Sequence, residues 1–221
     1  MPADRDVVDV PRDAVEVVRR YHRVERAASG VLALFAAGLV AAAVLWLSLL
    51  QAAVAALVVL AVVRVPFFRS HGVANLTTDA APEAVRADFT GPTPPVLTYQ
   101  WAVADEVRRT EAGAVYEVSY LFGIRSTSLT VEVREAPAGE GGATGDADLE
   151  LVVTTAGRPW ATYAVSVDER DGKTVVDVEF GSDRRYGLRR LPQWLVAQRY
   201  RDGVLAAQGY TVVERDVGLS L

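Results

Sequence analysis

The sequence predicts an α+β protein: an N-terminal transmembrane helical hairpin, followed by a curved antiparallel sheet around a long C-terminal helix. The first observation behind this prediction is a run without any charged residue from Ser29 to Val63. The second is a series of segments between Tyr116 and Phe180 in which apolar and polar residues alternate, as in half-buried strands. The third is the stretch from Pro192 to Gly209, where apolar residues recur every three or four positions. The predicted divisions are a cytoplasmic amphipathic segment (1–28), the transmembrane hairpin (29–68) and a cytoplasmic sheet-and-helix domain (72–221).

Residues 11–28 predict a short amphipathic helix. Its apolar residues recur at steps of three and four, and arginines occupy much of the remaining helical wheel. The apolar positions are Ala14, Val17, Val18, Tyr21, Val24 and Ala28. We expect this helix to lie on the membrane surface and to lead into the first span. A helix that binds a partner protein is the alternative.

The uncharged run has 35 residues, whereas roughly 18 apolar residues suffice for a membrane-spanning helix. As one helix it would be about 52 Å long, against a hydrocarbon core of about 30 Å. Two antiparallel spans, roughly Gly30–Leu47 and Leu50–Phe67, fit this thickness better. The turn would lie near Ser48 and Gln51, the strongly polar residues inside the run. A single long, tilted span is the alternative, because no Gly, Pro or Asn marks the turn.

Arginines flank this run on both sides. They are Arg19, Arg20, Arg23, Arg26, Arg64 and Arg69. Because Arg and Lys are enriched on the cytoplasmic side of membrane spans, both ends of the hairpin are expected in the cytoplasm. The run is also too long for the apolar part of a cleavable signal peptide. The predicted location is therefore the cell membrane, as a multi-pass protein with its soluble domain in the cytoplasm.

Composition excludes several kinds of site. The chain has no cysteine and two histidines, which excludes disulfides and thiolate chemistry and argues against a multi-histidine metal site. Residues 72–221 hold 15 basic and 22 acidic side chains, a net charge of −7, against +2 for residues 1–71 and −5 for the whole chain. An acidic domain is a poor nucleic-acid binder. We predict neither a cofactor, nor a metal, nor a nucleic-acid partner.

The domain is expected to open with a strand and a helix. Val73–Thr77 alternates as a short strand does, and Pro82 suits the first turn of a helix ending near Phe89. The following GPTPPV stretch is predicted to be a loop. The pattern of Val96–Ala104 fits either a short helix or a strand.

A series of strands with one apolar and one polar face follows. The inward positions are Tyr116, Val118, Tyr120, Phe122, Leu129, Val131, Val133, Tyr163, Val165, Val167, Val176, Val178 and Phe180. Strands with one wet face are typical of antiparallel sheets. Turns are expected at Phe122-Gly123, Ala156-Gly157 and Asp171-Gly172, the last a strong hairpin signal. The glycine-rich acidic stretch from Ala136 to Asp148 is predicted to be a flexible loop.

The closing helix carries one apolar stripe, which is predicted to face the sheet: Val196, Tyr200, Gly203, Val204 and Ala207. A second edge mixes apolar and polar residues: Leu191, Trp194, Leu195, Gln198, Arg201, Asp202 and Leu205. Gly209 suits the C-terminal cap of this helix. A last strand is expected from Tyr210 to Leu219.

Two segments carry a resemblance to a known family. VANLTTDAAPEAVRADF at the start of the domain and LPQWLVAQRYRDGVLAAQGY near its end resemble the first strand and helix and the closing helix of the START and Bet v 1-like (SRPBCC, polyketide cyclase) superfamily. The resemblance covers roughly Gly72–Gly209 and implies a helix-grip fold; the strand after the long helix departs from its simplest version. It also implies a cavity between sheet and helix that takes an apolar ligand such as a lipid, sterol or polyketide.

The candidate lining of this cavity is aromatic and aliphatic: Tyr116, Tyr120, Phe122, Trp160, Tyr163, Phe180, Val196 and Tyr200. The alternative is that these side chains simply fill the core. A second candidate site is a set of arginines suited to lipid phosphate head groups: Arg184, Arg185, Arg189 and Arg190. Its alternative is a solvated basic turn balanced by acids such as Asp183.

No catalytic residue is predicted. Asp105 with Glu106 and Asp168 with Glu169 are adjacent carboxylates, but neighbours in a strand point to opposite faces. The leading hypothesis is a membrane-anchored, non-catalytic module that binds a lipid or isoprenoid in the cavity, with the lipid bilayer as its partner. The alternatives are a scaffold of a membrane complex with a filled core and an enzyme of the cyclase kind. The sequence identifies no protein partner.

Overall fold

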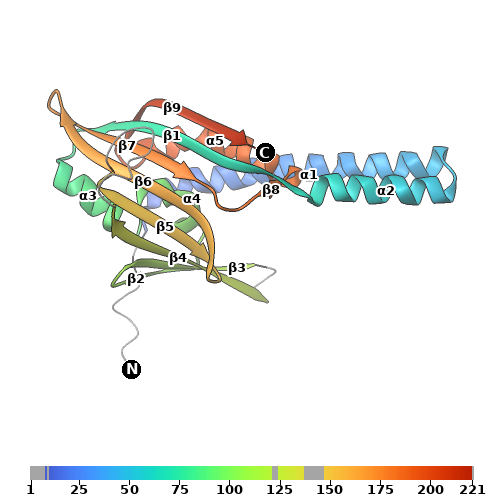
Figure 1. Ribbon diagram of the computed structural model, residues 1–221, viewed down its shortest axis with the longest axis horizontal. Helices are drawn as coiled ribbons and strands as arrows, with labels where there is room; N and C mark the ends of the chain where they lie inside the picture. Colours follow the sequence, from blue (N-terminus) through green and yellow to red (C-terminus); the bar gives the residue numbers. More distant parts are fainter. Residues whose placement is uncertain (1–7, 9, 121–123, 137–146, 221) are drawn as a thin grey trace.

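Two apolar helices extend from one end of a sheet-and-helix domain as a stalk (Figure 1). This computed structural model describes residues 8, 10–120, 124–136 and 147–220. The first helix, α1 (Arg12–Trp46), has 35 residues, and α2 (Leu49–Arg64) runs back beside it. Of the helices described, α1 alone is long and apolar enough to be a candidate membrane span.

The chain reverses between α1 and α2 at Leu47 and Ser48 without a glycine or proline. Both residues have extended backbone, and the Ser48 backbone N–H donates a hydrogen bond to Oε1 of Gln51 at 3.1 Å. This side-chain cap satisfies a backbone group that the start of α2 would otherwise leave free. The two polar residues of the uncharged run therefore lie where the chain turns.

The first turns of α1 pack against the domain, which corrects the expectation that this segment lies on a membrane surface. Ala14, Val18 and Tyr21 are buried, and Val18 and Tyr21 form a cluster with Val204 of α5 (Leu191–Ala206). An apolar stripe on a helix indicates that some apolar surface covers it. The stripe itself does not distinguish a lipid surface from another helix.

Within the described residues, nine strands form one antiparallel sheet, as the alternating pattern predicted. The strands are β1 (Pro66–Thr78), β2 (Glu106–Thr110), β3 (Gly113–Tyr120), β4 (Arg125–Glu135), β5 (Leu149–Thr155), β6 (Arg158–Arg170), β7 (Lys173–Gly181), β8 (Tyr186–Gly187) and β9 (Thr211–Ser220). Their order is β2-β3-β4-β5-β6-β7-β1-β8, and β9 also pairs with β1. The first strand is thus a central one, because β7 pairs with it from His71 to Thr78 and β9 from Arg69 to Thr77.

The strands depart from the predicted ranges in two respects. The first strand has 13 residues and begins directly after α2, so it is much longer than Val73–Thr77. The strands β2, β5 and β8 were not predicted. Two hairpin turns lie at the predicted dipeptides, and Ala156 and Asp171 have the positive φ values of 49° and 54° that such turns require before glycine. The predicted turn at Phe122-Gly123 and most of the loop 136–148 lie outside the described residues.

Short helices occupy the stretch between β1 and β2. They are α3 (Pro82–Thr90), the 3₁₀ turn η1 (Pro95–Leu97) and α4 (Thr98–Trp101). Trp101 is fully buried and its Nε1 donates to the carbonyl of Pro94 at 3.0 Å, which holds the proline-rich segment against the core. The stretch 96–104, which fitted either structure, is therefore helical at its start.

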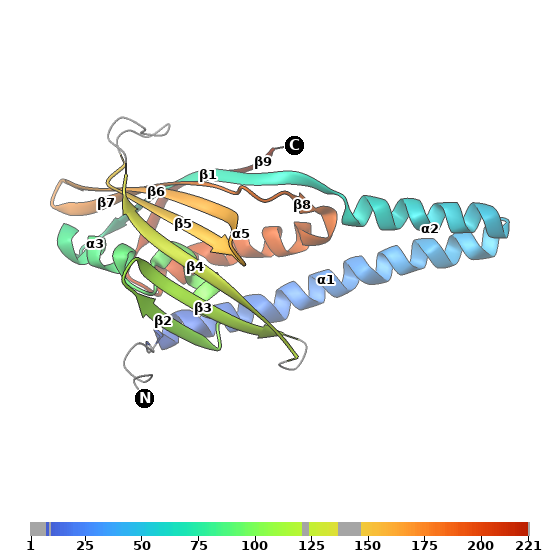
Figure 2. The ribbon, with the colours of Figure 1, turned by 60° about the horizontal axis from the view of Figure 1, so that its bottom comes forward.

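The long helix α5 is the middle of three layers, with the sheet on one side and α1 on the other (Figure 2). Leu205 belongs to the main core under the sheet, whereas Val204 packs against Val18 and Tyr21. Val196 and Tyr200 lie with Val204 on the α1 side, so the prediction that this stripe faces the sheet is wrong. Because both sides of α5 are covered, the more regular apolar stripe does not identify the sheet-facing side.

Candidate functional site

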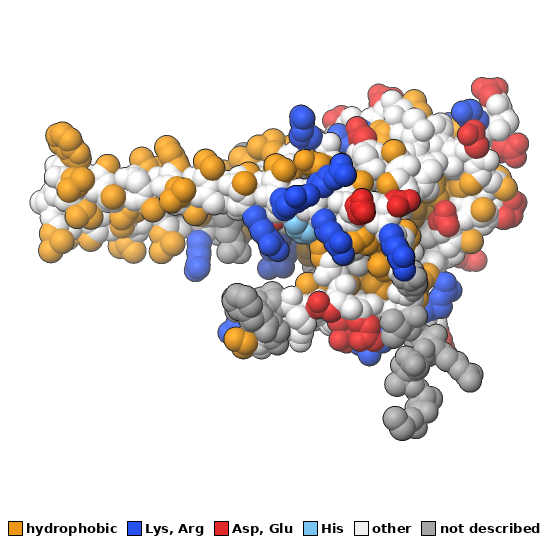
Figure 3. Space-filling model, turned by 180° about the vertical axis from the view of Figure 1, so that it is seen from behind, with side chains coloured by type: hydrophobic (Ala, Val, Ile, Leu, Met, Phe, Trp, Pro, Cys, Tyr) orange, Lys and Arg blue, Asp and Glu red, His pale blue; other side chains and the backbone are white. Residues whose placement is uncertain are grey.

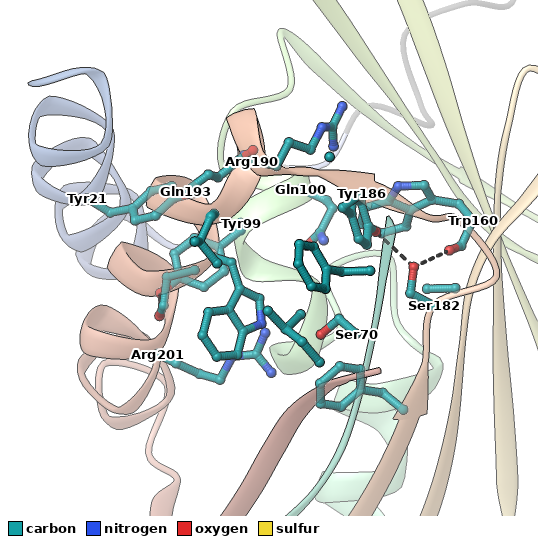
Figure 4. A pocket seen from close by; sticks show the side chains of 18 of the residues that line it. Tyr21, Ser70, Tyr99, Gln100, Trp160, Ser182, Tyr186, Arg190, Gln193 and Arg201 are labelled. Atoms are coloured by element: carbon teal, nitrogen blue, oxygen red, sulfur yellow. Dashed lines mark hydrogen bonds between the residues drawn. The ribbon is translucent and has the colours of Figure 1, made fainter. Parts of the chain in front are cut away.

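A cavity of about 170 Å³ lies where α5, the sheet and α1 meet (Figure 4). Its walls come from segments that are far apart in the sequence. The lining residues are Tyr21 of α1; Phe68 and Ser70 of β1; Tyr99 and Gln100 of α4; Trp160, Ala161 and Tyr163 of β6; Phe180, Ser182, Tyr186 and Gly187 in and after β7; Arg190, Leu191, Gln193, Trp194, Ala197 and Arg201 at and within α5; and Leu219 of β9. The volume is about tenfold what one water molecule needs, so the space suits part of an organic molecule.

Aromatic rings form much of the cavity wall. Tyr163 and Phe180, neighbours on paired strands, stack with ring centroids 5.9 Å apart. The guanidinium carbon of Arg201 lies 5.3 Å from the centroid of the Phe180 ring, within the range of a cation–π contact. The Arg201 guanidinium therefore lies beside an aromatic wall that otherwise suits an apolar ligand.

Two polar side chains of the lining have no hydrogen-bond partner among the described residues. They are Oε1 of Gln100, an acceptor, and Nε1 of Trp194, a donor, and both atoms are buried. More than nine in ten buried polar groups in proteins are paired, because an unpaired one costs about 1–3 kcal/mol. Both are thus buried polar atoms of residues that line the cavity.

Tyrosine hydroxyls near the cavity are held neutral by burial. Burial raises the pKa of Tyr163 to about 12 and that of Tyr21 to about 12. Burial also raises the pKa of Tyr99, whose hydroxyl donates to the carbonyl of Ala197 at 3.1 Å. At neutral pH these groups are hydrogen-bond donors, and none of them is poised as a base.

Of the eight predicted lining residues, the structure brings together Trp160, Tyr163 and Phe180. Tyr116 is fully buried in the core, away from this cavity, and its hydroxyl has no described partner. Val196 and Tyr200 pack toward α1 instead, because they lie on the side of α5 that α1 covers. The Tyr120 side chain and Phe122 lie outside the described part of the chain.

Sequence reasoning missed several lining residues. Tyr21 belongs to the amphipathic stripe of α1, and Tyr99 to the stretch whose structure was undecided. Trp194 and Arg201 lie on the mixed edge of α5, and that edge is the signal that was available. Because this edge of α5 carries both aromatic and charged residues, it forms a cavity wall that is partly apolar and partly polar.

A second, basic cleft of about 750 Å³ adjoins the first cavity. The two share Trp160, Tyr186, Gly187 and Arg190. The charged residues of the cleft are Arg64, Arg158, Arg184, Arg185, Arg190 and Asp183. Arg184, Arg185 and Arg190 were predicted as head-group contacts; the fourth, Arg189, has a side chain outside the described part. Outside this cleft, Figure 3 shows that basic side chains on the rear face also gather, beside a histidine, where the apolar stalk joins the domain.

The residues that the structure describes contain no group of three or more His, Asp or Glu side chains that could hold a metal ion. We assign a function to the cavity and to the basic cleft.

Comparisons with known proteins add little to this description. No family model matches the chain, and no curated protein matches it. Among solved structures, the chain is similar to a conserved protein from Geobacillus kaustophilus, with 12% identity over 65% of this chain and 99% of that one and a TM-score of 0.34. It is also similar to a putative uncharacterized protein from Rhizobium leguminosarum, with 13% identity over 62% of this chain and 94% of that one and a TM-score of 0.28. Structural similarity at this level carries no argument about function.

Proposed function

We propose that the protein is a membrane-anchored, non-catalytic module that binds an apolar ligand, a lipid or isoprenoid, in the cavity between α5, the sheet and α1. The observation that carries this proposal is the aromatic cavity itself. Its walls offer large apolar surfaces with a few polar groups, the usual composition of a small-molecule site. Gln100, Gln193 and Arg201 are among the polar side chains of the lining.

The stalk supports a membrane anchor of two spans. From Ser29 to Trp46, α1 is about 27 Å long, and α2 with its 16 residues is about 24 Å, close to the bilayer core of about 30 Å. Apolar side chains on the stalk are exposed, including Leu45 (81%), Trp46 (86%) and Leu49 (87%). Surfaces of this kind are stable in lipid and costly in water.

Charge supports a cytoplasmic domain. Arg23 and Arg26 of α1 and Arg64 of α2 lie at the end of the stalk that joins the domain, and the turn at Leu47 and Ser48 carries no charge. The positive-inside rule then places the domain in the cytoplasm and the turn on the far side.

The order of elements supports a helix-grip domain. A strand, short helices, a series of antiparallel strands and a long helix follow one another, and the strand order returns to β1 after β7. In such an arrangement the long helix covers one face of the sheet and leaves a space between them, where the cavity lies. A lipid drawn from the adjacent bilayer would have a short path to this space.

Two alanines in β6 provide a matched test. Ala161 lines the cavity, whereas Ala164, three residues on, belongs to the opposite face of the strand. We expect Ala161→Leu to fill part of the cavity and to weaken binding of a fluorescent fatty acid or isoprenoid probe by the full-length protein by about tenfold. Ala164→Leu is expected to leave binding unchanged. If the wild-type protein binds neither probe, the proposed function is wrong.

A further inference from the structure

We propose that the basic cleft binds the phosphate of the lipid whose tail occupies the adjoining cavity. This inference rests on the proposed lipid-binding function and adds the chemical class of the ligand: a single-tailed or double-tailed amphiphile with a phosphate head group. The phosphate head group of one lipid molecule lies in the cleft, and its tail lies in the adjoining cavity.

Four of the five arginines of the cleft come together from three separate parts of the chain, and the fifth is Arg190. Arg64 ends α2, Arg158 begins β6, and Arg184 and Arg185 lie between β7 and β8. None of these four forms an ion pair with an acid in the described part of the chain, and Asp183 is the one acidic residue of the lining. Arginine forms planar, charge-assisted hydrogen bonds with phosphate oxygens, so this cleft matches a phosphate rather than a neutral head group.

Five other arginines of the domain do form ion pairs with acids. Ion pairs join Arg86 to Asp148, Arg108 to Glu117, Arg134 to Glu132, Arg170 to Asp168 and Arg215 to Asp202. The domain as a whole is acidic, with 15 basic and 22 acidic residues from 72 to 221. Arg64, Arg158, Arg184 and Arg185, which form no ion pair within the described part of this acidic domain, concentrate positive potential at one place.

The cleft also lies at the level where a lipid head group would be. Arg64 is the last residue of α2, so the cleft begins where the proposed span leaves the bilayer. The backbone of β8 comes close to this point, because a Cβ on Gly187 would lie 3.0 Å from the carbonyl oxygen of Val65. Trp160, Tyr186, Gly187 and Arg190 border both the cleft and the cavity, so the two spaces adjoin. A phosphate in the cleft and a tail in the cavity can therefore belong to one molecule.

The test compares two ligands with the same tail on the full-length protein in detergent. Decanoyl lysophosphatidic acid carries a phosphate, and monodecanoyl glycerol does not; binding of each is measured by calorimetry, with inorganic phosphate as a third ligand. We expect the phosphate-bearing lipid to bind at least about tenfold more tightly than the neutral one, since hydrogen bonds to charged groups are strong. Arg158→Ala/Arg184→Ala should abolish that preference and leave the affinity for the neutral lipid unchanged.

The control is Arg23→Ala/Arg26→Ala, which removes two exposed arginines at the base of the stalk but outside the cleft. This control variant should keep the preference for the phosphate-bearing lipid over the neutral one. An equal loss of that preference in both double variants would mean that the positive surface attracts the phosphate non-specifically, and it would overturn the inference. Equal binding of the two lipids by the wild-type protein would overturn it while leaving the proposed function intact. Binding of neither lipid would reject both, and inorganic phosphate binding as tightly as the phosphate-bearing lipid would show that the tail plays no part.

Discussion

Single residues at the cavity owe their properties mainly to burial. Tyr163 is 6% exposed and Tyr21 3% exposed, and burial raises the pKa of each to about 12. The unfolded chain ionises these hydroxyls near pH 10, whereas the folded chain keeps them neutral. Their contribution to stability is therefore fully present below pH 10 and is lost as the pH rises through 12.

We predict that the free energy of unfolding falls by up to about 1.4 kcal/mol per pH unit for each of these tyrosines between pH 10 and 12. Denaturant titrations of the detergent-solubilised protein at several pH values measure this slope. Tyr163→Phe removes one of the ionising groups and should make the slope shallower. Identical slopes in the wild-type protein and the variant would show that Tyr163 ionises normally in the folded state.

For single residues, the sequence pattern predicted the side of the sheet on which some of the lining residues lie. The alternation of β6 and β7 correctly placed Tyr163 and Phe180 on the inner face, because a strand allows only two sides. The same alternation placed Tyr116 inward but gave no information on its position along the sheet, and Tyr116 lies in the filled part of the core. Tyr21 and Tyr99 could not be assigned, since they meet at the cavity through the packing of α1 and α4 against α5.

Among the elements, α5 is the one whose surroundings differ most from the prediction. It lies between the sheet and α1, so its regular apolar stripe meets another helix. We predict that Val204→Asp, at a residue 2% exposed, places a carboxylate against Val18 and Tyr21 and lowers stability by several kcal/mol. The measurement is thermal unfolding of the solubilised full-length protein.

Leu195→Asp introduces the same side chain on the same helix, at a residue that is 55% exposed. It should change stability by less than about 1 kcal/mol, as surface substitutions usually do. Equal effects of the two variants would show that α1 does not cover this side of α5. A loss confined to Val204→Asp would support the three-layer arrangement.

The elements themselves were largely predictable, and their partners were not. The antiparallel sheet, the helix from Pro82 and the long C-terminal helix follow from periodicity, caps and hairpin dipeptides, all of which are local signals. The pairing of β9 with β1 joins segments about 140 residues apart, and the docking of α1 on α5 joins segments about 180 residues apart. No local pattern specifies such contacts.

For the whole molecule, the proposal requires the stalk to be a hairpin in the bilayer. The chain has no natural cysteine, so single cysteines report topology without a background. We predict that Asp13→Cys, in the first turn of α1, and Glu169→Cys, in β6, react with a membrane-impermeant reagent from the same side. Ser48→Cys, at the turn of the stalk, should react from the opposite side. Reaction of Asp13→Cys and Glu169→Cys from opposite sides would mean a single span.

The proposed function rests on one claim, that the cavity holds a lipid taken from the membrane in which the stalk is anchored. Native mass spectrometry of the full-length protein, extracted in mild detergent, detects such a lipid. We expect a bound species with the mass of a phospholipid or isoprenoid on the wild-type protein. The same species should persist in Ala164→Leu and be lost in Ala161→Leu, because of these two alanines only Ala161 lines the cavity. A wild-type protein that carries no lipid, or equal occupancy in the two variants, would contradict the claim.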